Sequence, residues 1–305
     1  MFSAAMLDLH RNGIYNPQSR IHPVGYPAGG LKPSAAAINH GQGGCGNVRK
    51  IDINCDMGES FGAWTMGMDG EVIQYVTSAN IACGYHAGDP HVMYRTVKLA
   101  KDHGAGVGAH PGYPDLVGFG RRNIDCTPEE ARDYVAYQIG AMKAFCALHG
   151  VPLQHVKPHG SLYNMSVGNE RLVRAIVEAI AGVDKNVIYL ALGGAQAPLI
   201  ARIAKETGIR VAFEAFPDRA YTPEGTLAPR SLPGAVIKDP EVAAERALRM
   251  AKEGKIITTD GSVLEMQIDT ICVHGDNPSA VELVRQIRAT IEAESIQVVP
   301  MGTFI

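Results

Sequence analysis

From Lys50 onward, short apolar runs alternate with segments of helical periodicity, and this alternation is the strongest constraint on the fold. Strands that are separated by helices are joined by crossover connections, so they run parallel within one sheet. Continuous apolar runs are typical of strands that are buried on both faces. We predict seven or eight such strands: Ile51–Cys55, Ala79–Cys83, Ala105–Ala109, His155–Lys157, Val187–Leu192, Ile209–Glu214, Thr270–Val273 and, as the eighth, Ile296–Val299.

Capping signals mark the helices between these strands. Thr127 and Glu130 have the spacing of a capping box. Capping side chains also precede prolines at three positions, Asp89, Asp239 and Asn277. Glycines stand where helices are expected to end: Gly104, Gly150, Gly208 and Gly254. This pattern predicts a distorted TIM-like (β/α) barrel of seven or eight mostly parallel strands, with an open doubly wound sheet as the alternative.

Composition and motifs exclude several classes of protein. The net charge of −3 offers no field that would gather nucleic acid or an anionic membrane, and no apolar run is long enough to span a bilayer. The N-terminus lacks the order of a signal peptide, so we expect a cytoplasmic protein. The six cysteines form no C-x-x-C pair, which indicates reduced thiols. No G-x-G-x-x-G follows the first strand and no P-loop motif is present, which disfavours dinucleotide binding.

The first 49 residues differ from the rest of the chain. Glycine and proline clusters occur there without sustained periodicity, for example over residues 25–30 and 41–46. Such a segment cannot easily bury an apolar face, so we expect a flexible extension. The predicted organisation is an extension at residues 1–49 and a catalytic domain at residues 50–305.

Histidines and charged side chains gather where the predicted strands end. In a parallel barrel the carboxyl ends of the strands form the active site, so these side chains are expected to converge there. A lone histidine at a strand end is often a hydrogen-bonded structural residue, but several at one mouth favour acid–base chemistry or metal binding. Lys157 lies among apolar strand residues and needs a carboxylate partner if it is buried. The candidate catalytic residues are Asp56, Glu59, His86, His110, Lys157 and His159.

A second group of polar residues is predicted to bind substrate. The segment 216–234 is long and proline-rich, as expected of a lid or binding loop, and its arginines suit a carboxylate or phosphate. Asp89 and Asp276 have an alternative interpretation as helix caps. The candidate binding residues are Asn54, Asp89, Glu214, Asp218, Arg219, Arg230 and His274.

Several consecutive motifs resemble one family. They include N-x-D-x-G-E from Asn54, S-A-N-I-A-C-G-Y-H-A-G-D from Ser78, G-A-H-P-x-Y-P-D from Gly108 and H-V-K-P-H-G-x-L-Y-N from His155. The run E-x-F-P-D-R-x-Y-x-x-x-G-x-L-x-P-R-x-x-x-G-A begins at Glu214. From about Lys50 to the C-terminus the chain resembles the LamB/YcsF family of lactam-utilisation proteins, which implies a barrel akin to glycoside hydrolases and polysaccharide deacetylases.

The resemblance implies the role of the A subunit in a prokaryotic-type 5-oxoprolinase. Such an enzyme opens the lactam of 5-oxoproline to L-glutamate at the expense of ATP, together with B and C subunits. ATP would bind this chain or its partners, and a divalent metal and a homo-oligomer remain open. In this scheme Asp56, His86 and His110 activate water or bind a metal, and Lys157 and His159 lie near the lactam oxygen or phosphate. The loop arginines hold a carboxylate or phosphate.

Two other functions fit the same residues. The first is a metal-dependent amidohydrolase or deacetylase that acts alone, with Asp56, His86 and His110 as ligands of a divalent metal. The second is a non-catalytic protein that only presents the lactam to other chains, although a binding site needs fewer titratable groups than this chain offers.

Overall fold

The computed structural model describes residues 48–274 and 278–305. The predicted extension at residues 1–49 therefore lies outside the described residues except for Val48 and Arg49, and so do the proposed caps Asp276 and Asn277. Within the described ranges, no helix combines the length and apolar character that crossing a bilayer requires.

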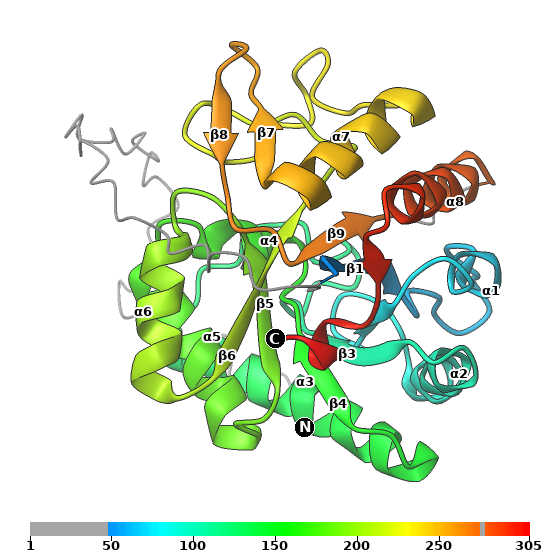
Figure 1. The fold of residues 1–305 in the computed structure, drawn as a ribbon. Coiled ribbons are helices and arrows are strands. Elements are labelled where there is room, and N and C mark those ends of the chain that lie inside the picture. Colours follow the sequence, from blue (N-terminus) through cyan, green and yellow to red (C-terminus); the bar gives the residue numbers. More distant parts are fainter. Residues whose placement is uncertain (1–47, 275–277) are drawn as a thin grey trace, which may run out of the picture. The chain divides into compact units, whose positions relative to one another are not determined.

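Seven parallel strands close into a barrel (Figure 1). The ring closes because β9 pairs with β6 on one side and with β1 on the other, through register pairs such as Glu214 with Thr270 and Asp52 with Thr270. This closure confirms the predicted barrel and excludes the open sheet. The strands of the ring are β1 (Lys50–Met57), β2 (Ser78–Ala82), β3 (Gly106–His110), β4 (Leu153–Val156), β5 (Ile188–Leu192), β6 (Arg210–Ala215) and β9 (Thr270–Val273).

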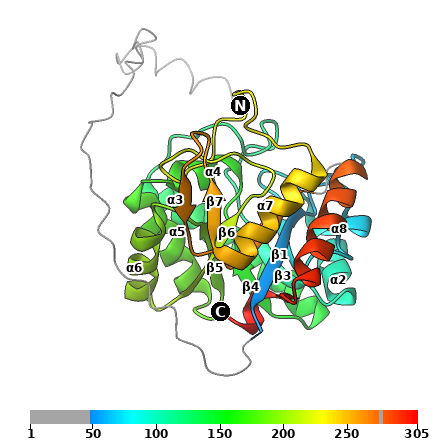
Figure 2. The ribbon, with the colours of Figure 1, turned by 45° about the horizontal axis from the view of Figure 1, so that its top comes forward.

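Helices cover the outside of the ring (Figures 1 and 2). The capping box of Thr127 and Glu130 is present, Asp89 and Asp239 each accept two backbone N–H bonds at a helix start, and Gly150, Gly208 and Gly254 end helices in the left-handed conformation. The helices are α1 (Asp69–Val72), α2 (Pro90–Asp102), α3 (Pro128–His149), α4 (Gly160–Ser166), α5 (Glu170–Val183), α6 (Ala197–Thr207), α7 (Pro240–Glu253), α8 (Pro278–Ala293) and the short 3-10 turn η1 (Met301–Thr303).

Three further strands lie outside the ring. The predicted strand at Ile296–Val299 exists as β10 (Gln297–Val298), but among the described strands it pairs only with the start of β1. An antiparallel hairpin of β7 (Lys255–Ile257) and β8 (Val263–Glu265) was not predicted from the sequence. These strands are three residues long and partly exposed, so they lack the apolar run by which the barrel strands were recognised.

Polar side chains fill part of the barrel interior below the strand ends. Asp52 is fully buried and accepts hydrogen bonds from the hydroxyls of Thr77, Ser78 and Thr270 and from the backbone N–H of Met301. Burial outweighs these bonds and raises the pKa of the Asp52 carboxyl to about 6. The bonds tie β1, β2, β9 and η1 together beneath the cavity described next.

Candidate active site

A cavity of about 1010 Å³ opens at the carboxyl ends of the strands. Its lining contains nine of the candidate residues, contributed by β1, β3 and the segments that follow β1, β4, β6 and β9. They are Asp56, Glu59, His110, Lys157, His159, Asp218, Arg219, Arg230 and His274. The mouth of the barrel thus brings together these nine of the thirteen residues that were expected to form the site.

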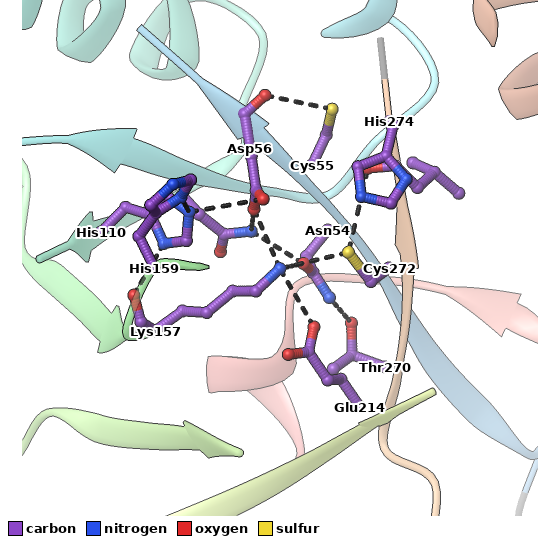
Figure 3. Close-up of polar contacts among 12 residues, drawn as sticks. Asn54, Cys55, Asp56, His110, Lys157, His159, Glu214, Thr270, Cys272 and His274 are labelled. Atoms are coloured by element: carbon purple, nitrogen blue, oxygen red, sulfur yellow. Dashed lines mark hydrogen bonds and ion pairs between the residues drawn. The ribbon is translucent and has the colours of Figure 1, made fainter. Parts of the chain in front are cut away.

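Lys157 forms the charged centre of the cavity floor (Figure 3). Its Nζ lies 2.9 Å from Asp56 Oδ1 and 3.2 Å from Glu214 Oε2, so the predicted need for a carboxylate partner is met twice. Burial would lower the pKa of the Lys157 ammonium, but Asp56 and Glu214 outweigh it and hold the pKa well above its usual value. The ammonium is therefore a fixed positive charge at the base of the cavity.

Asp56 links this cation to the histidines. Burial would raise the pKa of its carboxyl, but the positive charges of His110, when protonated, and Lys157 outweigh burial and hold the pKa well below its usual range. Asn80 donates to Oδ1 at 2.8 Å, and the other carboxylate oxygen lies 3.3 Å from His110 Nε2. Asp56 is therefore an oriented carboxylate with one oxygen directed at His110.

Three histidines pack against one another beside Asp56. The rings of His86 and His159 stack in parallel with centroids 3.7 Å apart, and His110 lies edge-on to both. Burial first, and the neighbouring His110 second, lower the pKa of His159 to about 3, and burial together with His159 lowers the pKa of His86. The imidazoles of His86 and His159 are therefore neutral at pH 7.

Glycine allows the chain to cross these rings. Gly120, at φ +63°, lies so close that a Cβ atom there would be 2.7 Å from His86 Cβ and 2.8 Å from His159 Cδ2. A side chain at this position would displace the stacked pair. Glu59 follows a second left-handed glycine, Gly58, and its Oε1 lies 3.8 Å from His86 Nε2.

The long loop after β6 forms one wall of the cavity. Arg219 is buried, and its guanidinium donates to the carbonyls of Ala228 and Ala235, so it holds the loop together as well as lining the cavity. Arg230 lines the same wall, so two cations lie on it. Burial first, and the positive charge of Arg230 second, lower the pKa of Arg219. Asp218 accepts from His274 Nδ1 at 2.9 Å, which links the loop to the end of β9.

The other predicted residues lie elsewhere. Asn54 is buried below the floor, where it donates to Thr270 and accepts from Asn80. Glu214 and His86 are buried behind Lys157 and His159. Asp89 does not line the cavity: one of its oxygens caps α2 and the other accepts from Gly62 N.

Three residues that shape the site were not among the candidates from the sequence. Asn80 lies within an apolar run and bridges Asn54 and Asp56. Arg121 lines the cavity, and in the sequence it is marked only as the last residue of a short G-F-G-R run, residues 118–121. Cys272, one of the cysteines expected to be reduced thiols, is buried, and its Sγ lies 3.1 Å from Lys157 Nζ. Burial raises the pKa of the Cys272 thiol, which disfavours a role as nucleophile.

Comparison with known proteins identifies the family of the chain. The sequence pattern of the LamB/YcsF family matches residues 51–305. The chain belongs to the LamB/YcsF family. Among the family's members, a protein of Pyrococcus furiosus, named as the A subunit of 5-oxoprolinase, is 57% identical over 256 residues, which cover 84% of this chain and 99% of that protein. A protein of the same name from Syntrophobacter fumaroxidans is 52% identical over 253 residues, 83% of this chain and 99% of that protein.

A solved structure shares the fold. The crystal structure of the lactam utilization protein from Thermus thermophilus is 47% identical in sequence and superposes with a TM-score of 0.77, covering 82% of this chain and 99% of that one. The LamB/YcsF assignment thus rests on both sequence and structure.

Proposed function

We propose that this chain is the A subunit of an ATP-dependent 5-oxoprolinase, which acts in the cytoplasm with B and C subunits and hydrolyses the lactam of 5-oxoproline to L-glutamate. One observation of the site carries the proposal: a fixed ammonium and an imidazole face the two oxygens of the same carboxylate, Asp56, on the floor of the cavity. The names of the relatives support the lactam as the substrate.

The chemistry needs an activated carbonyl, because a five-membered lactam is a stable amide with a poor leaving group. In the proposed reaction the γ-phosphoryl group of ATP is transferred to the lactam oxygen and ADP leaves. Water then adds to the ring carbon, the C–N bond breaks, and the nitrogen takes up a proton to become the amine of glutamate. Hydrolysis of the remaining acyl phosphate releases inorganic phosphate.

The residues of the cavity have different roles in the proposed reaction. Asp56 and His110 orient the attacking water, because they lie side by side at the cavity surface. The ammonium of Lys157 stabilises negative charge on the lactam oxygen or its phosphate, as a fixed charge in a poorly hydrated site can. Arg219 and Arg230 face the substrate carboxylate from the loop.

The nucleotide is proposed to enter with the partners. The chain has no P-loop motif, so binding of ATP by the B and C subunits, with transfer into this cavity, fits the sequence best. Partner dependence is accordingly a central part of the proposal.

The decisive experiment measures glutamate and ADP formed from 5-oxoproline and ATP, with this chain alone and with its B and C partners. We expect both products, in equal amounts, only from the complete set. ADP without glutamate, or no reaction by the full set, would overturn the proposal.

A second candidate, a metal-dependent amidohydrolase that acts alone, is favoured by one observation: Glu59, His86, His110 and His159 lie close enough together to hold a cation. Amide hydrolysis by the isolated chain without ATP, abolished by a chelator, would select it.

A further inference from the structure

Two backbone carbonyls fix the protonation of His110 and His159. His110 Nδ1 lies 2.7 Å from the carbonyl of Lys157, and His159 Nε2 lies 2.8 Å from the carbonyl of Phe119. A carbonyl only accepts, so each of these nitrogens carries a proton. In the neutral rings, His110 Nε2 and His159 Nδ1 are then both unprotonated.

These two nitrogens face each other. His110 Nε2 and His159 Nδ1 are 3.0 Å apart, and both rings are buried. Two lone pairs at this distance repel unless a positive centre lies between or beside them. That centre is either a proton shared by His110 and His159 next to Asp56, or a metal ion.

A third imidazole favours the metal ion. His86 is fully buried, and neither of its ring nitrogens has a hydrogen-bond partner in the part of the chain that the structure describes. A buried polar group without a partner destabilises the folded chain. Its Nε2 faces Glu59 Oε1 at 3.8 Å, and the same oxygen lies 3.9 Å from His159 Nδ1. A shared proton would leave His86 unexplained. A cation uses all three rings if the His86 ring turns out of its parallel stack on His159, because lone pairs in two parallel planes do not meet at one ion.

The dimensions suit a transition metal. The four donor atoms of Glu59, His86, His110 and His159 lie within 4.8 Å of one another. Ligand nitrogens about 2.0–2.1 Å from Zn²⁺ are separated by roughly 3.0–3.4 Å, depending on the angle at the metal. The separation of His110 Nε2 and His159 Nδ1 already has this value, whereas Glu59 must approach the two rings and the His86 ring must turn toward the ion. Hydrogen bonds from the remote ring nitrogens to carbonyls are how metal-binding histidines are usually oriented.

We propose that Glu59, His86, His110 and His159 form a binding site for one divalent transition-metal ion, of which Zn²⁺ is the best match to three imidazoles and a carboxylate. This set differs from the triad that the sequence suggested: Glu59 and His159 join His86 and His110, and Asp56 is not in the group of mutually close donor atoms. Metal binding rests on the geometry alone; its use in lactam opening rests on the proposed function. There a bound cation would polarise the carbonyl or acidify a water molecule.

Metal binding can be measured without substrate, ATP or partners. The full-length chain is freed of metal with a chelator, dialysed, and titrated with Zn²⁺ and with Co²⁺ as a spectroscopic probe. We expect one equivalent to bind, a rise in the melting temperature, and visible absorption bands of Co²⁺ with nitrogen ligands.

Two variants and a control locate the site. His159→Ala should weaken binding by at least about 100-fold, because it removes a ligand where even outer partners are worth 10–100-fold. Glu59→Gln preserves the size of the side chain and should weaken binding by about 10–100-fold, which keeps the test valid if His159→Ala fails to fold. His103→Ala, an exposed histidine, should bind like the wild type.

The proposal is overturned if the wild-type chain binds neither ion, or if Glu59→Gln binds as tightly as the wild type. The first result would leave the shared proton as the cause of the short nitrogen–nitrogen distance. Neither result depends on whether the chain opens a lactam, so failure of the metal site and failure of the proposed function are distinguished.

Discussion

At the scale of single residues, the sequence could predict partners but not the hydrogen bonds that orient them. A lysine within an apolar strand had to meet a carboxylate, and Lys157 meets Asp56 and Glu214. The protonation of His110 and His159 depends on carbonyls that lie 47 and 40 residues away in the chain, and no local pattern encodes such contacts. Asn80 was not predicted as a site residue for the same reason, because the two side chains to which it donates lie on a neighbouring strand.

Substitution of Lys157 by methionine tests the charged floor. Lys157→Met leaves the buried carboxylate of Glu214 and the partly buried carboxylate of Asp56 without their cation, so we expect a loss of about 3–5 kcal/mol in the free energy of unfolding. Adding Glu214→Gln should restore part of it, because one buried charge is removed. Urea unfolding measures both, with Lys98→Met as a control, whose exposed ion pair with Asp102 should leave the midpoint unchanged. A stable Lys157→Met protein would contradict the burial argument.

Asp52 predicts an unusual dependence of stability on pH. Its pKa is about 6 in the folded chain and near 3.8 when unfolded, so between these values the folded state binds more protons. Stability from this group is therefore greatest below pH 4 and falls by about 3 kcal/mol as the pH rises through 6. Asp52→Asn keeps the acceptor for two hydroxyls but cannot ionise. The difference in unfolding free energy between the wild type and this variant, measured from pH 4 to 8, should change by this amount; a constant difference would refute the raised pKa.

At the scale of elements, the correct predictions were those of helix ends, where a few adjacent residues determine the structure. Asp89 and Asp239 before prolines gave the helix starts, and Gly150 gave a helix end, because caps satisfy backbone groups locally. The β7–β8 hairpin was missed because its pairing is antiparallel and its strands are short. The loop after β6 was recognised by length and prolines, but its internal support by Arg219 was not.

Substitutions of the two loop arginines should differ in their effects on substrate binding and on the stability of the fold. Arg230 is exposed at the cavity, so Arg230→Gln should raise KM for 5-oxoproline by roughly 10–100-fold, the value of one charged hydrogen bond, with kcat and the melting temperature unchanged. Arg219→Gln should also lower the melting temperature, because Ala228 and Ala235 lose their donor. Steady-state kinetics of the assembled enzyme and thermal unfolding distinguish the two. An unchanged KM in Arg230→Gln would remove it from the carboxylate contact.

At the scale of the whole molecule, the sequence favoured a barrel over an open sheet by the number of its strands, and the structure shows the closure that no sequence motif marks. Both consist of parallel strands joined by helices, but a doubly wound sheet reverses its strand order and keeps two edges, whereas here the last strand of the ring, β9, pairs with the first, β1. That pairing joins residues more than 200 positions apart and involves no special residue type. Once the ring closes, the floor is complete, because Lys157 from beyond β4 reaches Asp56 on β1 and Glu214 on β6 across the barrel.

Substitution of His110 in the assembled enzyme tests whether this cavity performs the chemistry. If the cavity performs the chemistry, His110→Ala should assemble with the B and C subunits like the wild type while glutamate formation falls by about 100-fold or more, the usual contribution of acid–base or metal-dependent groups. Size-exclusion chromatography of the mixed subunits measures assembly, and glutamate release measures turnover. The exposed His103→Ala serves as the matched control and should retain both. Near-normal turnover by an assembled His110→Ala complex would mean that this chain presents the lactam and that the bond is broken elsewhere.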